Sequence, residues 1–172
     1  MTVDEIIKLA LDEDLGDGDH TSLATIPDDA SGKAELLAKE DGILAGVEVA
    51  SKVFKAVDPE VEVKVLKKDG VVIRKGDIVL TVAGSAQSIL SAERTALNFL
   101  QRMSGIATYT YQLVRKLEGL KTKLLDTRKT TAANRHIEKM AVRIGGGENH
   151  RFGLYDMVMI KDNHVDFAGG IR

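Results

Sequence analysis

The sequence predicts an α/β protein built in two parts. Some segments carry apolar residues at helical spacing, whereas others alternate apolar and polar residues as half-buried strands do. Helices and strands are mixed up to about residue 105, and from residue 121 the order becomes strand, helix, strand. Because a β-α-β order is typical of parallel sheets, we expect a mixed α/β domain over residues 1–105 and the start of a parallel βα array over residues 106–172.

The expected first domain opens with a helix. Thr2 and Glu5 have the spacing of a capping box, and apolar residues follow at helical intervals. The further elements that we expect, in chain order, are a strand over 33–46, a helix over 47–57, a strand over 61–65, a hairpin formed by 71–73 and 78–82, and a helix over 86–103.

The expected second part begins with a helix over 108–117 that ends at Gly119. A strand over 121–126, a helix over 134–144 and a strand over 157–161 follow, and the helix has one clean apolar face. A complete (β/α)8 barrel needs about 250 residues, so we expect a barrel that begins near residue 121 to be cut short at Arg172.

The composition narrows the class of protein. The 172 residues carry a formal net charge of −2, with three Tyr, four Phe and no Trp, so a nucleic-acid partner is not expected. Cysteine is absent, which excludes disulfides and thiolate metal sites and fits a reducing cytoplasm. No apolar run approaches the length of a membrane span and no signal-peptide pattern is present, so we expect a soluble cytoplasmic protein without a membrane partner.

Cationic side chains gather where the strands of the second part end. Arg128 and Lys129 follow the strand over 121–126, Lys161 ends the strand over 157–161, and His150-Arg151 lies between them. Ligand-binding groups collect at such strand ends, so this set predicts a site for a phosphate or carboxylate. The alternatives are a solvated loop for the first pair, and a charge entering solvent or a Schiff-base lysine for Lys161.

The run Gly145–Gly147 follows the predicted helix over 134–144. Its first expected task is to cap that helix in a left-handed conformation, and three glycines in a row also let backbone N–H groups approach an anion. The sequence has neither a P-loop nor a dinucleotide-binding fingerprint, so it does not indicate a nucleoside triphosphate or NAD. The histidines lack the spacing of metal ligands, so no protein-built metal site is expected.

Arg94 falls on the apolar stripe of the predicted helix over 86–103, four residues after Leu90 and three before Leu97. A lone charge is costly to desolvate, so Arg94 should meet an acidic residue such as Glu93, a partner chain or a ligand. The spacing leaves these alternatives open.

Several ordered blocks of the sequence resemble the quinolinate phosphoribosyltransferase family. The acidic, glycine-rich segment 13–19 resembles its N-terminal signature, and the segments 92–98 and 104–108 resemble its block on and after a long helix. The remaining blocks are Asp126-Thr127-Arg128-Lys129-Thr130, Ala141-Val142-Arg143-Ile144-Gly145-Gly146-Gly147-Glu148-Asn149-His150-Arg151 and Ile160-Lys161-Asp162-Asn163-His164. Together they cover the whole chain in order, which is more specific than any single block.

The resemblance implies an open, hammerhead-like α/β domain followed by an irregular α/β barrel with the active site at the C-terminal strand ends. It implies an enzyme of NAD biosynthesis, a pentosyltransferase that converts quinolinate and phosphoribosyl pyrophosphate to nicotinate mononucleotide, pyrophosphate and CO2, with Mg²⁺ accompanying the pyrophosphate. It also implies a homodimer, or a higher even oligomer, in which subunits share sites.

By motif, the resemblance assigns the binding of the two anionic substrates to Arg94, Thr127, Arg128, Lys129, His150, Arg151 and Lys161. Lys129 and Lys161 are expected to act in catalysis, and Arg94 is expected to reach the partner subunit's site. The family usually has Pro after its Thr-Arg-Lys-Thr block, where this chain has Thr131-Ala132, and its acidic ribose and metal ligands lie on later barrel strands. We therefore expect the 172-residue chain to bind anions weakly and to be inactive.

Other functions fit parts of the same sequence. A paralogue of the same fold, either a molybdenum-transport-associated or a nicotinate phosphoribosyltransferase-like enzyme, would share most of these blocks. The segment 71–82 resembles a lipoyl-type hairpin with Lys75 near its turn, which would suit a carrier module. A non-catalytic assembly module is the third alternative.

Overall fold

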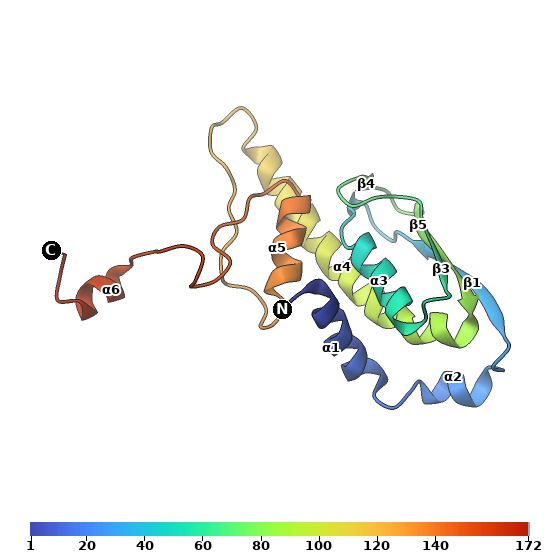
Figure 1. Cartoon of the computed structure of the whole chain (residues 1–172). Helices are drawn as coiled ribbons and strands as arrows, with labels where there is room; N and C mark the ends of the chain where they lie inside the picture. The colour runs from blue at the N-terminus through green and yellow to red at the C-terminus, as the bar shows by residue number, and fades with distance from the viewer. Residues whose placement is uncertain (172) are drawn as a thin grey trace.

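The structure is a computed structural model that describes residues 1–171, so Arg172 lies outside the described part of the chain. A small antiparallel sheet has helices packed on one face, and a further helix lies against the longest of them (Figure 1). The last residues project away from this body and end in a short helix.

The N-terminal helix α1 spans Val3–Leu15 and confirms the predicted capping box. The backbone N–H of Thr2 donates to Glu5 Oε2 at 2.6 Å, and the N–H of Glu5 donates to Thr2 Oγ1 at 3.2 Å. A second helix, α2 (His20–Thr25), was not predicted, because the acidic, glycine-rich sequence before it indicates only a turn. Asp19 caps α2 by accepting the N–H of Ser22 at 3.1 Å.

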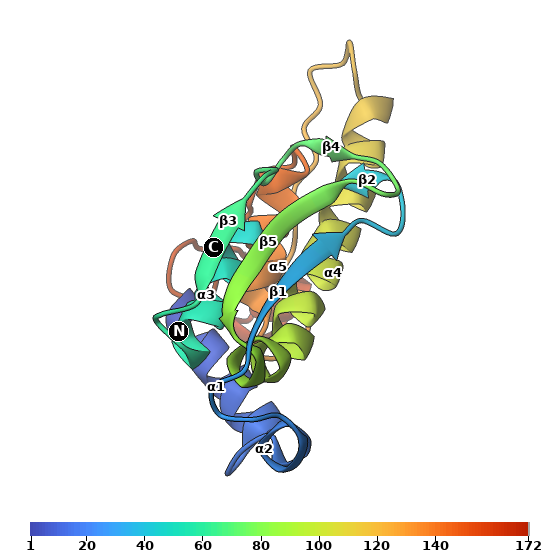
Figure 2. The same ribbon diagram turned by 90° about the vertical axis from the view of Figure 1, so that its right-hand side faces the viewer.

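The main sheet has three antiparallel strands in the order β1 (Ser31–Leu37), β5 (Ile78–Ser85) and β3 (Glu62–Val65). Figure 2 shows its open face, with helices behind it. Side chains of β1 alternate between exposed and partly buried, as expected for a strand with one face on a core. The predicted strand over 33–46 is therefore too long, because the chain leaves β1 at Leu37.

The predicted hairpin over 71–82 is wrong in its pairing. β4 (Val72–Ile73) and β5 do flank the predicted turn, but β4 pairs with β2 (Gly42–Ile43) in a separate two-stranded sheet. β5 pairs instead with β1 and β3. The turn connects two sheets, and tertiary pairing overrides the local hairpin signal.

Helices α3 (Val47–Val57) and α4 (Ala86–Lys116) cover the inner face of the sheet. The predicted α3 is confirmed at both ends. The predicted break between 103 and 108 is wrong, because α4 continues through Gly105 as one helix. Its hydroxyl side chains stabilise this stretch: Ser104 Oγ accepts the N–H of Ala45 at 3.0 Å, and Thr108 Oγ1 accepts the N–H of Ile43 at 2.8 Å.

The core lies between the sheet and these helices. Its buried side chains come from α1, α3, β5 and the inner face of α4, and they include Ile7, Val53, Leu80, Ala96 and Met103. Helix α5 (Arg135–Ile144) extends this core by packing Ile137 and Ala141 against α4. The predicted helix over 134–144 is thus confirmed, with Asn134 at its N-cap.

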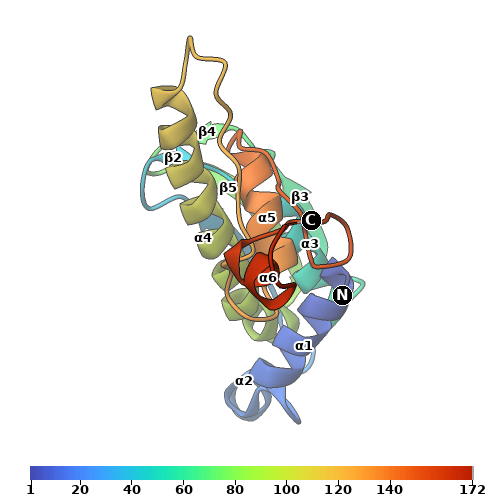
Figure 3. The ribbon, with the colours of Figure 1, turned by 90° about the vertical axis from the view of Figure 1, so that its left-hand side faces the viewer.

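The two predicted strands of the second part do not form as strands. In the segment 121–126, only Leu125 bridges in parallel with Glu148, and the described residues offer no pairing partner to 157–161. A parallel strand needs a hydrogen-bonded neighbour, so without one the second segment stays extended and unpaired. Val158 and Ile160 are 88% and 73% exposed. The segment leads into α6 (Asp162–Phe167), which lies apart from the main body in Figure 1 and in front of it in the view of Figure 3.

Over residues 1–171, no helix combines the length and the apolar character needed to cross a membrane.

Candidate anion-binding site

A polar cluster built around a buried ion pair joins the two segments that carry the predicted cationic residues. The ammonium of Lys139, on α5, pairs with the carboxylate of Asp126, and their side chains are only 2% and 7% exposed. Lys139 Nζ also donates to the carbonyl oxygen of His150 at 3.1 Å, and the N–H of His150 donates to Asp126 Oδ1 at 2.9 Å. The Asn149 amide nitrogen donates to Asp126 Oδ2 at 2.8 Å and to the carbonyl oxygen of Lys139 at 3.0 Å. We call these four residues the polar cluster.

The first loop leaves the polar cluster directly after Asp126. Thr127 is exposed, and its Oγ1 accepts the N–H of Lys129 at 3.1 Å. Arg128 is half-buried, and its Nε is buried without a hydrogen-bond partner among residues 1–171. Lys129 is exposed. A buried guanidinium N–H with no protein acceptor is a donor still able to bind an anion.

The second loop follows α5 and returns alongside the first. The backbone of Glu148 pairs with that of Leu124 and Asp126, which places the two loops side by side. His150 is half-buried, and Arg151 is only 7% exposed. Arg151 Nη1 donates to the carbonyl oxygen of Met157 at 3.2 Å, so part of its guanidinium is held by the backbone of its own segment.

Arg135, at the start of α5, ties both loops to the helix. Its Nε donates to Thr130 Oγ1 at 3.2 Å, and its Nη1 donates to the carbonyl oxygen of Phe152 at 3.0 Å. Its Nη2 donates to the carbonyl oxygen of Arg128 at 3.4 Å. One rigid, planar guanidinium thereby fixes one backbone group of each loop.

Each of the three glycines of the second loop is needed for a different reason. Gly145 lies against α4, and a Cβ at this position would overlap with the carbonyl oxygen of Ala107 and lie 2.8 Å from Thr110 Cβ. Gly146 has a φ of +89°, which L side chains rarely adopt. A Cβ on Gly147 would lie 2.8 Å from Val142 Cγ1. The left-handed cap predicted for this run is confirmed at Gly146, whereas Gly145 has a φ of −74°.

A partly buried ion pair holds the first loop to the N-terminal half of the chain. Arg102 Nη2, on α4, donates to Glu138 Oε1 at 2.6 Å and to Thr131 Oγ1 at 3.0 Å. Burial acts to raise the pKa of Glu138, but hydrogen bonds from Arg102 and Thr131 outweigh it, so the pKa lies below its ordinary value of 4.5.

This pair should make part of the stability dependent on pH. Because the folded-state pKa of Glu138 is depressed, its contribution is present above about pH 4.5 and is lost as the pH falls through the folded-state value. We expect Glu138→Gln to be less stable than the wild type at pH 7 and to lose less stability between pH 5 and 3. Urea unfolding of both proteins between pH 3 and 7 would measure this difference. Glu118→Gln, which removes a carboxylate from an exposed ion pair, is the control. Parallel pH profiles for wild type and Glu138→Gln would contradict the assignment.

Ala133, beside this pair, has a φ of +63°, the one positive value among the described non-glycine residues. A left-handed conformation costs a residue with a Cβ about 1–2 kcal/mol, whereas glycine loses more backbone entropy on folding, about 0.5–1 kcal/mol. We expect Ala133→Gly to raise the free energy of unfolding by about 0.5–1 kcal/mol, measured by urea denaturation. Ala132 does not have a left-handed φ, so Ala132→Gly should lower the free energy of unfolding. Equal effects of the two substitutions would show that the backbone of Ala133 is not strained.

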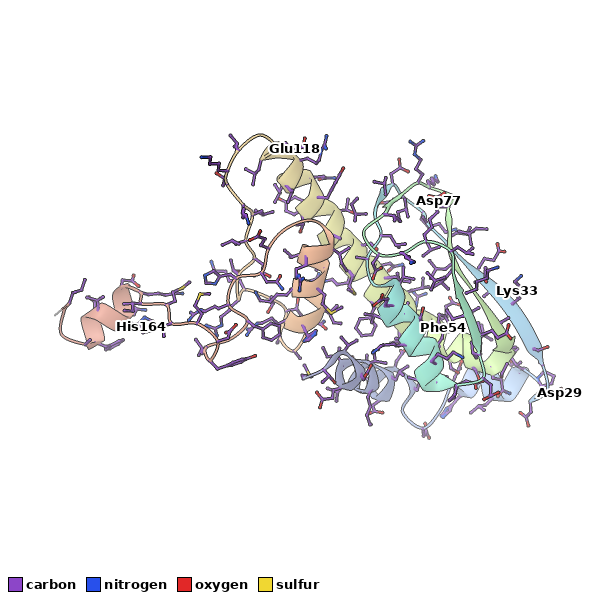
Figure 4. All side chains as sticks on the ribbon, turned by 45° about the horizontal axis from the view of Figure 1, so that its top comes forward. Asp29, Lys33, Phe54, Asp77, Glu118 and His164 are labelled. Atoms are coloured by element: carbon purple, nitrogen blue, oxygen red, sulfur yellow. The ribbon has the colours of Figure 1, made fainter. Side chains whose placement is uncertain are left out.

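Two residues predicted for the site lie away from the two loops. Lys161 precedes α6 on the projecting segment and is exposed, and Figure 4 marks this region at His164. Arg94 is exposed, so its charge is not desolvated by the described residues of this chain. The buried stripe of α4 passes through Ala92, Thr95 and Ala96, and Arg94 belongs to a second, outward stripe.

The residues that support the site have no recognisable signal in the sequence. Lys139, Arg135 and Glu138 look like solvent-facing charges of a short helix, and no local pattern sets them apart. Glu138 and Lys139 are buried and Arg135 is half-buried because both loops fold back over α5 while its other face packs on α4.

Comparison with known families agrees with this arrangement. Residues 19–104 match the quinolinate phosphoribosyl transferase N-terminal domain, and residues 106–172 match its C-terminal domain. The chain belongs to the quinolinate phosphoribosyltransferase family. The fold of an N-terminal α/β domain followed by the start of the family's barrel domain, predicted from the sequence, is thereby confirmed.

Individual relatives cover the chain almost completely. A rice protein named nicotinate-nucleotide pyrophosphorylase (carboxylating), chloroplastic, is 51% identical over 167 residues, which is 96% of this chain and 44% of the rice protein. A tobacco protein named quinolinate phosphoribosyltransferase (decarboxylating) 2b, mitochondrial, is 51% identical over 97% of this chain and 47% of its own length. The crystal structure of NadC from Streptococcus pyogenes superposes with a TM-score of 0.93 at 45% identity, over 98% of this chain and 60% of that one. The chain thus spans about half the length of the curated relatives it matches.

Proposed function

We propose that this chain forms the N-terminal domain and the beginning of the barrel of a quinolinate phosphoribosyltransferase. The reaction joins quinolinate to phosphoribosyl pyrophosphate and yields nicotinate mononucleotide, pyrophosphate and CO2, a step of NAD biosynthesis. The observation that carries the proposal is that the loops with Arg128-Lys129 and His150-Arg151 lie side by side and are joined by the buried ion pair of the polar cluster. The identity to the rice and tobacco enzymes supports it.

The chemistry requires a concentration of positive charge. Quinolinate is a dianion and the cosubstrate carries a pyrophosphate, so a basic, largely pre-formed pocket is needed for both. The pyridine nitrogen forms a bond to the ribose C1 while the bond from C1 to pyrophosphate breaks. The 2-carboxylate then leaves as CO2, and the electron pair left on the ring carbon takes up a proton. These steps need positioning and electrostatic stabilisation more than covalent help from the protein.

Each predicted residue has a role in this proposal. Arg128 and His150-Arg151 bind the carboxylates of quinolinate, since a guanidinium can bind a carboxylate with two hydrogen bonds. Lys129 faces the departing pyrophosphate as a compact positive charge, and Thr127 lines the pocket. Lys161 completes the pocket when its segment is paired as a barrel strand.

Mg²⁺ enters the proposal only as part of the cosubstrate. Within the described residues, no three His, Asp or Glu side chains are grouped so that they could hold a metal ion. The residues present therefore do not fit a built magnesium site, and we propose that the ion arrives with phosphoribosyl pyrophosphate.

We propose that two chains associate through the outward face of α4. This face carries Leu90, Arg94, Leu97 and Tyr109, and Leu90 and Tyr109 are 46% and 65% exposed. A groove of about 550 Å³ runs beside it, between α4 and the β1–β2 connection. An apolar face with a guanidinium in its middle suits an interface in which Arg94 reaches the partner's anionic substrate, as the family resemblance implies.

If two chains associate through this face, the chain should sediment as a dimer. Analytical ultracentrifugation should show a sharp boundary at twice the chain mass, and Leu90→Asp should shift it toward the monomer, because a buried unpaired carboxylate opposes association. Val158→Asp, on the projecting segment, is the matched control for an exposed apolar residue outside the interface. A monomer at high micromolar concentration, or the same dissociation by both variants, would contradict this interface.

We also propose a cytoplasmic location, which fits the absence of cysteine. Fractionation of the source cells with an antibody against the chain would test it, and recovery in an organelle would contradict it.

The proposed substrate can be tested on the chain itself. Quinolinate and nicotinate differ by one carboxylate, so a site built for a dianion should bind quinolinate more tightly. We expect an NMR titration to shift the Nε–H signals of Arg128 and Arg151 with quinolinate at lower concentration than with nicotinate. Equal affinities would favour the nicotinate phosphoribosyltransferase-like alternative, and no shift with either would contradict the site.

A further inference from the structure

We infer that Lys139 is a positioning residue whose buried ion pair with Asp126 sets the spacing between the two anion-binding loops. Lys139 does not face a ligand: its side chain is 2% exposed, and its ammonium is matched by the carboxylate. Nothing in the sequence marks it, and the reaction chemistry does not require it. The inference rests on the proposed function, because it concerns the site for the dicarboxylate substrate.

The connections of the pair support a positioning role. Asp126 directly precedes Thr127 and Arg128, and His150 directly precedes Arg151. His150 is held at both of its backbone groups, because its N–H donates to Asp126 at 2.9 Å and its carbonyl oxygen accepts from Lys139 at 3.1 Å. A displacement of either charge therefore moves the attachment points of both loops at once.

Burying the two charges of this pair also has a desolvation cost, so the pair is not explained by stability alone. Two charges buried together are often replaceable by apolar side chains of similar volume without loss of stability. Here the carboxylate accepts from Lys139 on α5 and from two groups of the second loop, the N–H of His150 and the Asn149 amide, so its bonds join the start of the first loop to the second loop and to α5. A site must be held within about 0.5 Å to bind its ligand productively, and fixed bonds of this kind provide that precision.

The chain offers a matched control for the pair. Lys123 Nζ pairs with Glu148 Oε1 at 2.6 Å and joins the same two segments, but their side chains are 68% and 50% exposed. A flexible surface pair should not define the distance between the loops. Lys123→Met thus removes a cation and a cross-link from the same region while leaving the polar cluster intact.

The test compares two probes that differ only in the separation of their carboxylates, benzene-1,2-dicarboxylate and benzene-1,3-dicarboxylate. Isothermal titration of the chain gives the ratio of their affinities, and a variant that merely unfolds part of the sample lowers both affinities without changing the ratio. The variants are Lys139→Met and the double variant Asp126→Leu/Lys139→Met. The double variant leaves no unpaired buried charge and so guards against failure to fold, which circular dichroism would monitor.

We expect the wild type and Lys123→Met to prefer the 1,2-isomer, as a site for quinolinate should. In the folded double variant this preference should fall by about tenfold, because a misplacement of about 1 Å can cost up to about 100-fold. A double variant that keeps the wild-type ratio would overturn the positioning role while leaving the proposed function in place. A wild type without any preference would count against the proposed function, and against this inference with it.

Discussion

Gly145→Ala is expected to lower the free energy of unfolding by about 3 kcal/mol, at the upper end of the range for overpacking a core. The new methyl group would overlap with the carbonyl oxygen of Ala107 and lie 2.8 Å from Thr110 Cβ, both on α4. Backbone atoms cannot move aside as a flexible side chain can, so α5 must shift away from α4. Urea unfolding followed by circular dichroism would measure the loss.

The neighbouring glycine is the control for this change. At Gly146 a methyl group has space, with Val114 Cγ1 the nearest atom at 3.7 Å, but φ is +89°. Gly146→Ala should therefore cost only the left-handed strain, about 1–2 kcal/mol. A smaller loss for Gly145→Ala than for Gly146→Ala would show that α5 does not pack on α4 as described.

Arg128→Ala is expected to weaken the binding of quinolinate to the full-length gene product by about 1.5–3 kcal/mol, the value of a hydrogen bond to a charged group. In affinity this is about 10- to 150-fold. The reason is the half-buried guanidinium, whose Nε has no acceptor within residues 1–171. Isothermal titration with quinolinate would measure the change.

Lys161→Ala should have an effect of the same size, again about 1.5–3 kcal/mol, in the full-length gene product. In the 172-residue chain it should have none, because there Lys161 lies on the exposed projecting segment. Arg143→Ala, which removes an exposed arginine from α5, is the control for the loss of charge. Unchanged affinity for both Arg128→Ala and Lys161→Ala in the full-length product would remove these residues from the site.

Local signals predicted the elements that depend on local interactions. The capping box of Thr2 and Glu5 and the apolar face of α5 are each contained in a short window, and both helices formed as predicted, as did α3. The same reasoning misplaced the break in α4, because Ser104 and Thr108 bind backbone groups about 60 residues earlier in the chain. Window-based signals carry no information about such distant partners.

In the site, too, the features that depend on local sequence were predicted and those that depend on distant contacts were not. The positions of Arg128, Lys129, His150 and Arg151 in two loops followed from motifs, and the structure brings these loops side by side. The polar cluster beneath them was not predictable, because Lys139 becomes buried only when both loops cover α5. Nor was the exposure of the segment 157–161, because its apolar residues predict a buried strand whereas the described chain offers it no neighbour.

The measurement that tests the proposed function most directly is turnover by the full-length gene product with quinolinate labelled at its 2-carboxylate. Phosphoribosyl pyrophosphate and Mg²⁺ are supplied, and labelled CO2 and nicotinate mononucleotide are counted together. The proposal predicts one CO2 released for each nicotinate mononucleotide formed, and no comparable product when nicotinate replaces quinolinate. Equal turnover of nicotinate, or no release of CO2 from quinolinate by a folded protein, would contradict it.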